Sequence, residues 1–401
     1  MTAGTGPRIA VALDGAGWHP AAWREPGARP RELLTAGYWA DLVREAEAGQ
    51  LDFVTFEDSL ALQTVSYLDR PGERTDIVQG RLDAVLIAAR VAPLTSHIGL
   101  VPTAVVTHTE PFHLSKAIAT LDYVSTGRAG VRVQVAGRVE DNRHFGRREF
   151  GEFRLEDSTE PDKPSPLKDQ FDEAADYVEV LRRLWDSWED DAEIRDVATG
   201  RFIDRDKLHY IDFEGRWFSV KGPSITPRPP QGQPPVTALA HAAIPYRLAA
   251  RAADVVYVTP FAREQATAIV AEVRDEQEKA GRAGETLHIF GDVVVFLDET
   301  EQAAADRKAR LDDRFGAAYS SDAYVFTGTP AGLADLLLDW QNAGLSGFRL
   351  RPGALPHDLI AITRGLVPAL RSRGVFRTAY EAGTLRGLLG LSRPANRYTA
   401  V

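Results

Sequence analysis

The sequence predicts an α/β fold, a (β/α)8 TIM barrel with insertions. Two observations support this prediction. Short apolar runs rich in β-branched residues alternate with amphipathic helical patterns along the chain, as they do in parallel sheets. Eight such strand–helix units follow one another, and eight units suit a closed barrel better than an open doubly wound sheet. A length of 401 residues fits one barrel that carries insertions.

The first half of the chain supplies four of the strands. We expect strands at Ile9–Leu13, Asp52–Phe56, His97–Val101 and Ala129–Val135, and helices at Tyr38–Ala48, Leu82–Ala92 and Pro111–Val124. In the last of these helices Pro111 stands in the first turn, where its missing N–H leaves no hydrogen bond unmade. Leu114 and Ile118 recur at helical spacing, and Gly127 can take the left-handed conformation that ends a helix.

Two polar, proline-containing segments interrupt the alternation, at about residues 138–168 and 189–233. We interpret them as insertions within one barrel domain that spans residues 1–401. A long amphipathic helix, Gln170–Trp188, lies between them. The second half then continues with strands at Pro235–Ala240, Val255–Thr259, Ile289–Leu297 and Gly347–Leu350, and helices at Tyr246–Ala253, Glu264–Ala280, Glu301–Arg314, Thr329–Asn342 and Leu359–Arg373.

Composition excludes several classes of function. The net charge is −10, and there is no basic run of the kind that binds nucleic acid. No apolar run approaches the roughly 20 residues that cross a bilayer, and residues 1–10 lack the pattern of a signal peptide. We therefore expect a cytoplasmic protein that acts on a small molecule, with no membrane or nucleic-acid partner. His108, Glu110 and His113 lack the spacing of a zinc motif, so no metal is expected.

The stretch from His108 to Val135 reads HTEPFHLSKAIATLDYVSTGRAGVRVQV. It resembles the P-Y/F-H-L-A-R-x-F/I-A-T-L-D-x-x-S-x-G-R-A-G signature of luciferase-like flavin-dependent monooxygenases. Blocks at residues 184–192, 206–232 and 373–397 are similar, in the same order, to the branch typified by nitrilotriacetate and dibenzothiophene-sulfone monooxygenases. The resemblance therefore extends over nearly the whole chain.

This resemblance implies an activity and its partners. Members of the family typically bind FMN, which a separate flavin reductase supplies in reduced form. The reduced flavin reacts with O2 to give a C4a-peroxyflavin, which oxygenates a small organic substrate, while the protein supplies position and excludes water. Relatives are often dimers or tetramers, so the resemblance also implies a homo-oligomer.

Three polar residues stand where barrel active sites lie, near the carboxyl ends of the strands. Asp58 matches the aspartate of the family's F-x-A-D-S motif, which lies at the flavin; a helix N-cap is the alternative role for such a residue. Thr103 matches a flavin-contacting hydroxyl of the family. Arg132 stands where this branch commonly has asparagine. An arginine inside a barrel needs an anion, and a cofactor phosphate, a substrate carboxylate and Asp58 are the candidates.

The candidate catalytic residues are Arg132, His19 and His108. Both histidines stand in loops that follow predicted strands. There an imidazole can act as a general base or contact the substrate. A surface or capping role is the alternative for either histidine.

The phosphate-binding residues of the family are absent. Many relatives carry a His-x-x-x-Tyr pair just before the long helix, and both side chains contact the flavin phosphate; here these positions are Leu167 and Phe171. The branch's phosphate loop, Q-A-G-x-S-x-x-G, aligns with residues 238–245. Ala240 and Ala242 replace its first glycine and its serine, which would approach and bond the phosphate at a helix N-terminus.

Two residues near this loop could replace the lost ligands: His241 as an imidazolium, and Arg247 in the next turn. The predicted cofactor-binding residues are accordingly Asp58, Thr103, Arg132, Ala240, His241 and Ala242. Two other interpretations remain open. The barrel could use the deazaflavin F420 for hydride transfer, or it could be a degenerate barrel that binds a small molecule or a partner without catalysis.

Overall fold

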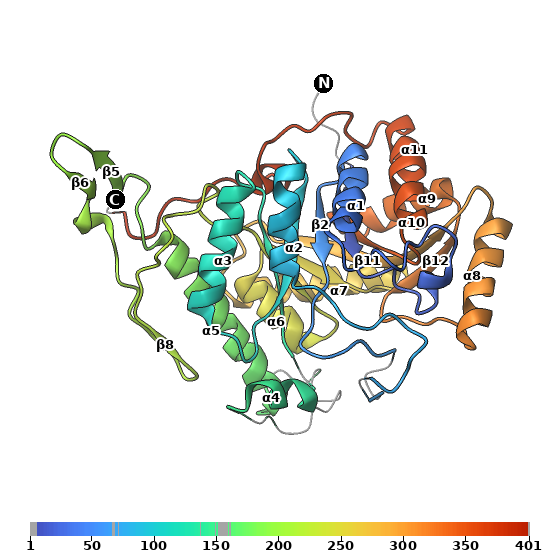
Figure 1. Cartoon of the computed structure of the whole chain (residues 1–401), viewed down its shortest axis with the longest axis horizontal. Helices are drawn as coiled ribbons and strands as arrows, with labels where there is room; N and C mark the ends of the chain where they lie inside the picture. The colour runs from blue at the N-terminus through green and yellow to red at the C-terminus, as the bar shows by residue number, and fades with distance from the viewer. Residues whose placement is uncertain are drawn as a thin grey trace.

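In the part of the chain that the structure describes, eight parallel strands close into a barrel that helices surround (Figure 1). The computed structural model describes residues 6–65, 69–70, 72–136, 138–148, 150, 159 and 162–399. The barrel strands are β1 (Arg8–Leu13), β2 (Phe53–Phe56), β3 (Gly99–Val105), β4 (Val131–Gln134), β9 (Val236–Leu239), β10 (Val255–Val258), β11 (His288–Leu297) and β13 (Gly347–Pro352). β13 pairs with both β11 and β1 and so closes the sheet. The predicted TIM barrel is confirmed.

The helices lie outside the barrel, and several begin at a capping side chain. Thr35, Ser165 and Thr329 each accept a backbone N–H from the first turn that follows. The helices are α1 (Ala36–Ala48), α2 (Ala84–Val91), α3 (Pro111–Val124), α4 (Val139–Phe145), α5 (Pro166–Asp186), α6 (Ala243–Ala252), α7 (Arg263–Lys279), α8 (Glu301–Phe315), α9 (Pro330–Gln341), α10 (His357–Ala361), α11 (Val367–Ser372) and α12 (Leu385–Leu388). None of the helices described here has the length and apolar character needed to span a membrane.

Two strands differ from the sequence prediction. β12 (Tyr324–Gly328) was not predicted. It pairs with the outer half of β11, because β10 pairs with β11 only as far as Gly291 and leaves the edge beyond it open. β3 continues to Val105, so Thr103 lies inside this strand rather than after it.

The predicted helix Leu359–Arg373 is divided in the structure. α10 and α11 are separated by a π turn at Ile362–Leu366. Pro368 lies just beyond this turn and has no N–H, so a regular α-helix through this point would lack one hydrogen bond. The helical pattern was therefore correct, and the proline changes its geometry.

The residues predicted as insertions hold little regular structure. The first segment contains α4, and parts of it lie outside the described residues. The second forms two small hairpins, β5–β6 (Glu193–Asp196 with Arg201–Ile203) and β7–β8 (Phe213–Glu214 with Ser219–Val220). Figure 1 shows both hairpins beyond α3 and α5, on the side of the molecule away from α8.

The polar residues of the signature stretch stabilise the fold. Arg128 is buried, and its guanidinium donates to three backbone carbonyl oxygens within residues 92–98. Asp122 accepts hydrogen bonds from the backbone N–H groups of Ala129 and Gln231. These bonds join α3 to the chain before β3 and to the chain before β9. The signature residues therefore stabilise the barrel by buried hydrogen bonds as well as by the packing of their apolar side chains.

The lower interior of the barrel, at the amino ends of the strands, is apolar. Its buried residues include Ala10, Phe53, Val101, Val255, Tyr257 and Phe290. Leu385 of α12 packs with this group and closes the barrel from below. Gly99 and Gly130 make room for it, because a Cβ at these positions would lie 2.6 and 3.0 Å from the Leu385 side chain.

His288 lies at this closed end, and its titration should make the stability of the fold depend on pH in the acid range. Its Nε2 lies 2.8 Å from the backbone oxygen of Leu389, and burial lowers the pKa of His288 from 6.5 to about 4. Between these two pH values only the unfolded chain binds the proton. The stability contributed by neutral His288 is therefore complete above pH 6.5, and up to ~3 kcal/mol of it is lost as the pH falls toward 4.

Urea unfolding as a function of pH measures this loss. His288→Gln keeps an N–H donor for the Leu389 oxygen but does not titrate. We expect the variant to lose less stability than the parent protein as the pH falls from 6.5 to 4. Equal losses in the two proteins would assign the acid sensitivity to other groups.

Candidate active site

Charged side chains fill the upper interior of the barrel, at the carboxyl ends of the strands. Glu57, the residue after β2, accepts hydrogen bonds from Arg132 Nη1 at 3.0 Å and from Arg349 Nη1 at 3.2 Å. Asp292 of β11 accepts two bonds from Arg349, at 2.9 and 2.5 Å, and two from Arg351, one from Nε at 2.8 Å and one from Nη2. We call these five residues the barrel charge cluster.

The carboxylates of the barrel charge cluster remain ionised although they are buried. Burial alone would raise the pKa of Glu57 and of Asp292, but the neighbouring arginines outweigh burial and lower both pKa values. Asp322 supplies a further negative charge at the outer edge, where it accepts a bond from Arg351 Nη1 at 2.7 Å. The three arginines of the cluster thus face three carboxylates, and their positive charge is largely neutralised.

The structure brings together two of the predicted site residues. Arg132 Nη1 donates to Thr103 Oγ1 at 3.0 Å and to Gln134 Oε1 at 3.1 Å. The Nε of Arg132 is buried and has no hydrogen-bond partner among the described residues. An unpaired buried donor is unfavourable, so an acceptor atom of a bound molecule at this nitrogen would stabilise it.

Asp58 does not join the cluster. Its carboxylate accepts the N–H groups of Ser59 at 2.8 Å and of Ala84 at 3.0 Å, and so it holds the start of α2. Side chains alternate along a strand, so Glu57 faces the interior while the next residue turns toward α2. Asp58, one of the three partners considered for Arg132, therefore does not pair with it, and Glu57 does. The contact of Asp58 with a flavin stays a prediction.

The two candidate catalytic histidines lie outside the cluster. His19 is buried; its Nδ1 accepts the N–H of Ala21 at 3.0 Å, and its Nε2 lies 3.0 Å from Asp312 Oδ1. Burial lowers the pKa of His19 and also that of His108. His108 has a φ of 70° and stacks on Phe145, with ring centroids 5.1 Å apart. Their catalytic roles stay predictions.

The residues after β9 form the start of α6. Ala240 is buried, and Ala242, the N-cap, makes no side-chain hydrogen bond. His241 Nδ1 lies 2.9 Å from Thr259 Oγ1, and its Nε2 lies 3.4 Å from Asp322 Oδ2. Burial lowers the pKa of His241. The imidazolium that the sequence suggested as a phosphate ligand is therefore disfavoured.

The other three residues that the sequence related to phosphate binding, Leu167, Phe171 and Arg247, pack against or pair with other parts of the protein. Leu167 is buried, and Phe171 packs against the main hydrophobic core. Arg247, the second replacement that the sequence suggested, pairs with Glu276 at 3.2 Å and with Asp162 at 3.1 Å. None of these three side chains is available to a phosphate group.

Two adjoining cavities lie at the barrel mouth. One, of about 590 Å³, lies between the loop after β1 and residues 319–322. The other, of about 270 Å³, lies between the ends of β3 and β4 and residues 59–64 with Arg81. Gln63, Thr64 and Arg81 line both cavities, which together offer the space of a small-molecule site. No cluster of His, Cys, Asp and Glu in the described part of the chain could hold a metal ion.

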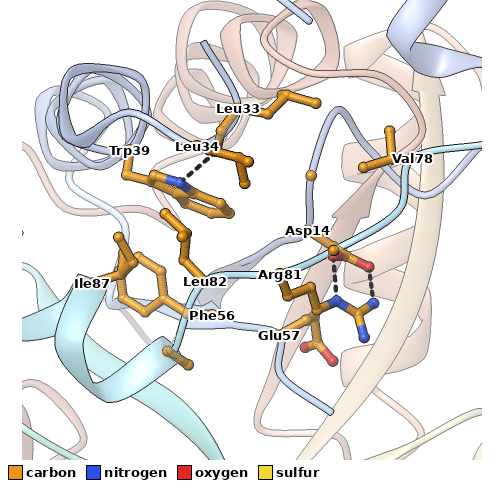
Figure 2. Close-up of a pocket in the computed structure, with 13 residues that line it drawn as sticks. Asp14, Leu33, Leu34, Trp39, Phe56, Glu57, Val78, Arg81, Leu82 and Ile87 are labelled. Carbon is orange, nitrogen blue, oxygen red and sulfur yellow. Dashed lines mark hydrogen bonds and ion pairs between the residues drawn. The ribbon is translucent and has the colours of Figure 1, made fainter. Parts of the chain in front are cut away.

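Arg81 is a mouth residue that the sequence analysis did not identify. It donates two hydrogen bonds to the carboxylate of Asp14, at 3.0 and 2.5 Å. Figure 2 shows this pair beside Glu57, with Trp39 and Phe56 across a small apolar cavity. Arg81 stands in a long loop without periodicity, so no local signal in the sequence indicated its position.

Polar side chains gathered at the carboxyl ends of parallel barrel strands define the site of a TIM-barrel enzyme. The sequence model of the luciferase-like monooxygenase family matches residues 16–326 of this chain. The chain belongs to the luciferase-like monooxygenase family.

Two relatives match the chain over almost its whole length. N-acetyl-S-(2-succino)cysteine monooxygenase of Bacillus subtilis is 30% identical and covers 98% of each chain. Nitrilotriacetate monooxygenase component A of Aminobacter aminovorans is 30% identical and covers 95% of each. Dibenzothiophene-sulfone monooxygenase of Rhodococcus erythropolis, 27% identical over 93% of each chain, is also similar. The predicted family and branch are confirmed.

Solved structures agree with the fold. A long-chain alkane monooxygenase matches with a TM-score of 0.83 at 23% identity, over 96% of this chain and 95% of its own. A riboflavin lyase solved with a modified FMN and riboflavin matches with a TM-score of 0.84 at 25% identity, over 98% and 97%.

Proposed function

We propose that this chain is a flavin-dependent monooxygenase that uses O2 and a reduced flavin to oxygenate a small organic substrate. The relatives are named as monooxygenases, and one of them is named as component A, which supports a separate reductase as the source of reduced flavin. The observation that supports a ligand in the upper interior of the barrel is the buried Nε of Arg132, which lacks an acceptor among the described residues.

The ring system of a flavin suits the donors in the upper interior of the barrel. The ring offers carbonyl oxygens and nitrogen acceptors, while Arg132 and Thr103 offer an N–H and a hydroxyl group. The phosphate of FMN does not fit in the same way. The positions that would hold it are Leu167, Phe171 and Ala242, and none of them has a polar side chain. The proposal therefore extends to the flavin ring and not to phosphate binding.

The chain's own residues would orient the ligand and exclude water. Glu57 and Thr103 fix the guanidinium of Arg132, so that its Nε stays in one position. Residues 59–64 and Arg81, which follow β2, line the mouth cavities, and these side chains would keep water from the reacting groups. A reduced flavin, when bound, supplies the electrons that activate O2.

Flavin binding tests the proposal directly. Purified protein is titrated anaerobically with FMN and riboflavin, before and after reduction by dithionite, while the fluorescence of its seven tryptophans is followed. We expect reduced flavin to bind with a dissociation constant on the order of 1 μM. Absence of quenching by every flavin in both redox states would reject the proposal. A parallel titration with deazaflavin F420 completes the test, and binding of F420 without binding of FMN or riboflavin would favour hydride transfer instead.

A further inference from the structure

We propose that this barrel recognises the ring and ribityl chain of a flavin without its phosphate, so that riboflavin binds about as tightly as FMN. This inference rests on the proposed function and narrows its ligand. A phosphate group needs hydrogen-bond donors and positive charge. Three features of the described residues reduce the number of donors and the positive charge at the place where the family resemblance puts the phosphate.

The first feature lies on α5. Leu167 is buried in the first turn of this helix, and Phe171, one turn later, packs against the main core. Neither side chain has an atom that can donate a hydrogen bond. The two phosphate contacts that a His-x-x-x-Tyr pair would make at these positions are therefore absent.

The second feature is the start of α6. A helix N-terminus binds anions because its first N–H groups have no partner within the helix. Here Ala242, the N-cap, adds no side-chain hydrogen bond, and Pro245 has no N–H. The next residue, Tyr246, already donates its N–H to the oxygen of Ala242 at 2.9 Å. The N–H groups of Ala242, Ala243 and Ile244 remain in this turn, one fewer than a helix start without proline offers.

The third feature is the charge beside this helix start. The carboxylate of Asp322 lies 3.4 Å from His241, and its side chain is 47% exposed. Burial opposes its ionisation, but Arg351 outweighs this effect and lowers the pKa of Asp322, so the carboxylate is ionised. Arg351 is also bound by Asp292, which leaves little positive charge there. A phosphate would meet a carboxylate, whereas the hydroxyl groups of a ribityl chain can donate to it.

A comparison of two flavins tests this inference. The anaerobic titration is repeated with dithionite-reduced riboflavin and dithionite-reduced FMN, and we expect their dissociation constants to differ by less than about tenfold. Several charge-assisted hydrogen bonds to phosphate would instead favour FMN by about 100-fold or more. An FMN preference above about tenfold would overturn the inference and leave the proposed function intact. Absence of binding by both flavins would overturn the proposed function itself.

A variant that restores a hydrogen-bond donor for phosphate at the start of α6 provides a second test. The double variant Ala242→Ser, Asp322→Asn places a hydroxyl at the N-cap of α6 and removes the neighbouring carboxylate. We expect it to raise the ratio of the riboflavin dissociation constant to the FMN dissociation constant about tenfold, because any loss at the ribityl chain affects both flavins alike. The matched control is Ala262→Ser, because Ala262 is the N-cap of α7 and likewise makes no side-chain hydrogen bond. The control should change the affinity for neither flavin.

The double variant also tests where the ribityl chain ends. If it strengthened the binding of both flavins equally, or of neither, the phosphate end of FMN would not lie at the start of α6. The inference would then be wrong, because it places the end of the ribityl chain at the start of α6. Far-UV circular dichroism of each variant confirms that the helices are retained, so that a change in affinity reports on the site.

Discussion

Replacing Asp292 with alanine should lower the free energy of unfolding by about 3–5 kcal/mol. The carboxylate is fully buried and accepts hydrogen bonds from Arg349 and Arg351. Without it, two guanidinium groups would remain in the barrel interior with one counter-charge fewer. A buried charge that loses its partner is strongly destabilising, because neither water nor another ion can replace the lost interaction. Urea unfolding followed by circular dichroism measures the loss.

Asp322→Ala is the matched control, because it removes a second carboxylate from the same Arg351. The Asp322 side chain is 47% exposed, so water can solvate the part of the guanidinium that it leaves. We expect this variant to lose no more than about 1 kcal/mol. Similar losses in the two variants would contradict the argument that burial determines the cost.

The barrel could be predicted from the sequence because its signal is local. Buried parallel strands are short apolar runs, and each stands beside turn residues and a helical pattern. β12 could not be predicted in this way. Its pairing depends on the edge that β11 leaves open beyond Gly291, and that edge exists only once β10 has paired. The π turn before Pro368 likewise changes the geometry of a helix whose existence the pattern had indicated correctly.

The barrel charge cluster was only partly predictable. Arg132 was identified because an arginine within an apolar strand needs an anion. The same reasoning applies to Arg349 and Arg351, which stand at alternate positions of β13 and so face the interior together. The signal for these residues was therefore present in the sequence. The choice of Glu57 rather than Asp58 as the acid partner required the strand to be placed in the barrel.

Side-chain contacts between segments that are distant in the sequence could not be predicted. His19 stands in a loop where an imidazole could meet a substrate, yet it binds Asp312, which lies 293 residues further along the chain. Arg81 reaches Asp14 from an irregular loop, and no spacing connects the two. Such pairs depend on how loops from different strands meet at the barrel mouth, and residue type alone does not encode this.

Replacing Arg132 with methionine should weaken the binding of reduced riboflavin and of reduced FMN alike, by about 100-fold. Methionine fills part of the same space but removes the unpaired Nε donor and the charge beside the ligand. The fold should persist, because Glu57 keeps its bond to Arg349. Arg132→Lys keeps the charge and loses the planar guanidinium, so we expect an intermediate loss of about tenfold. The anaerobic fluorescence titration measures all of these affinities.

Arg247→Met is the control for this prediction, because both arginines were candidates for binding an anion. Arg247 is engaged by Glu276 and Asp162 on the outside of α6, so its replacement should change the affinity for neither flavin. Undiminished affinity in Arg132→Met, with unfolding still cooperative, would show that the Nε does not face a ligand. A loss of FMN binding alone in Arg247→Met would place the phosphate at Arg247 and contradict phosphate-independent recognition. The two variants therefore separate recognition of the ring from recognition of the phosphate.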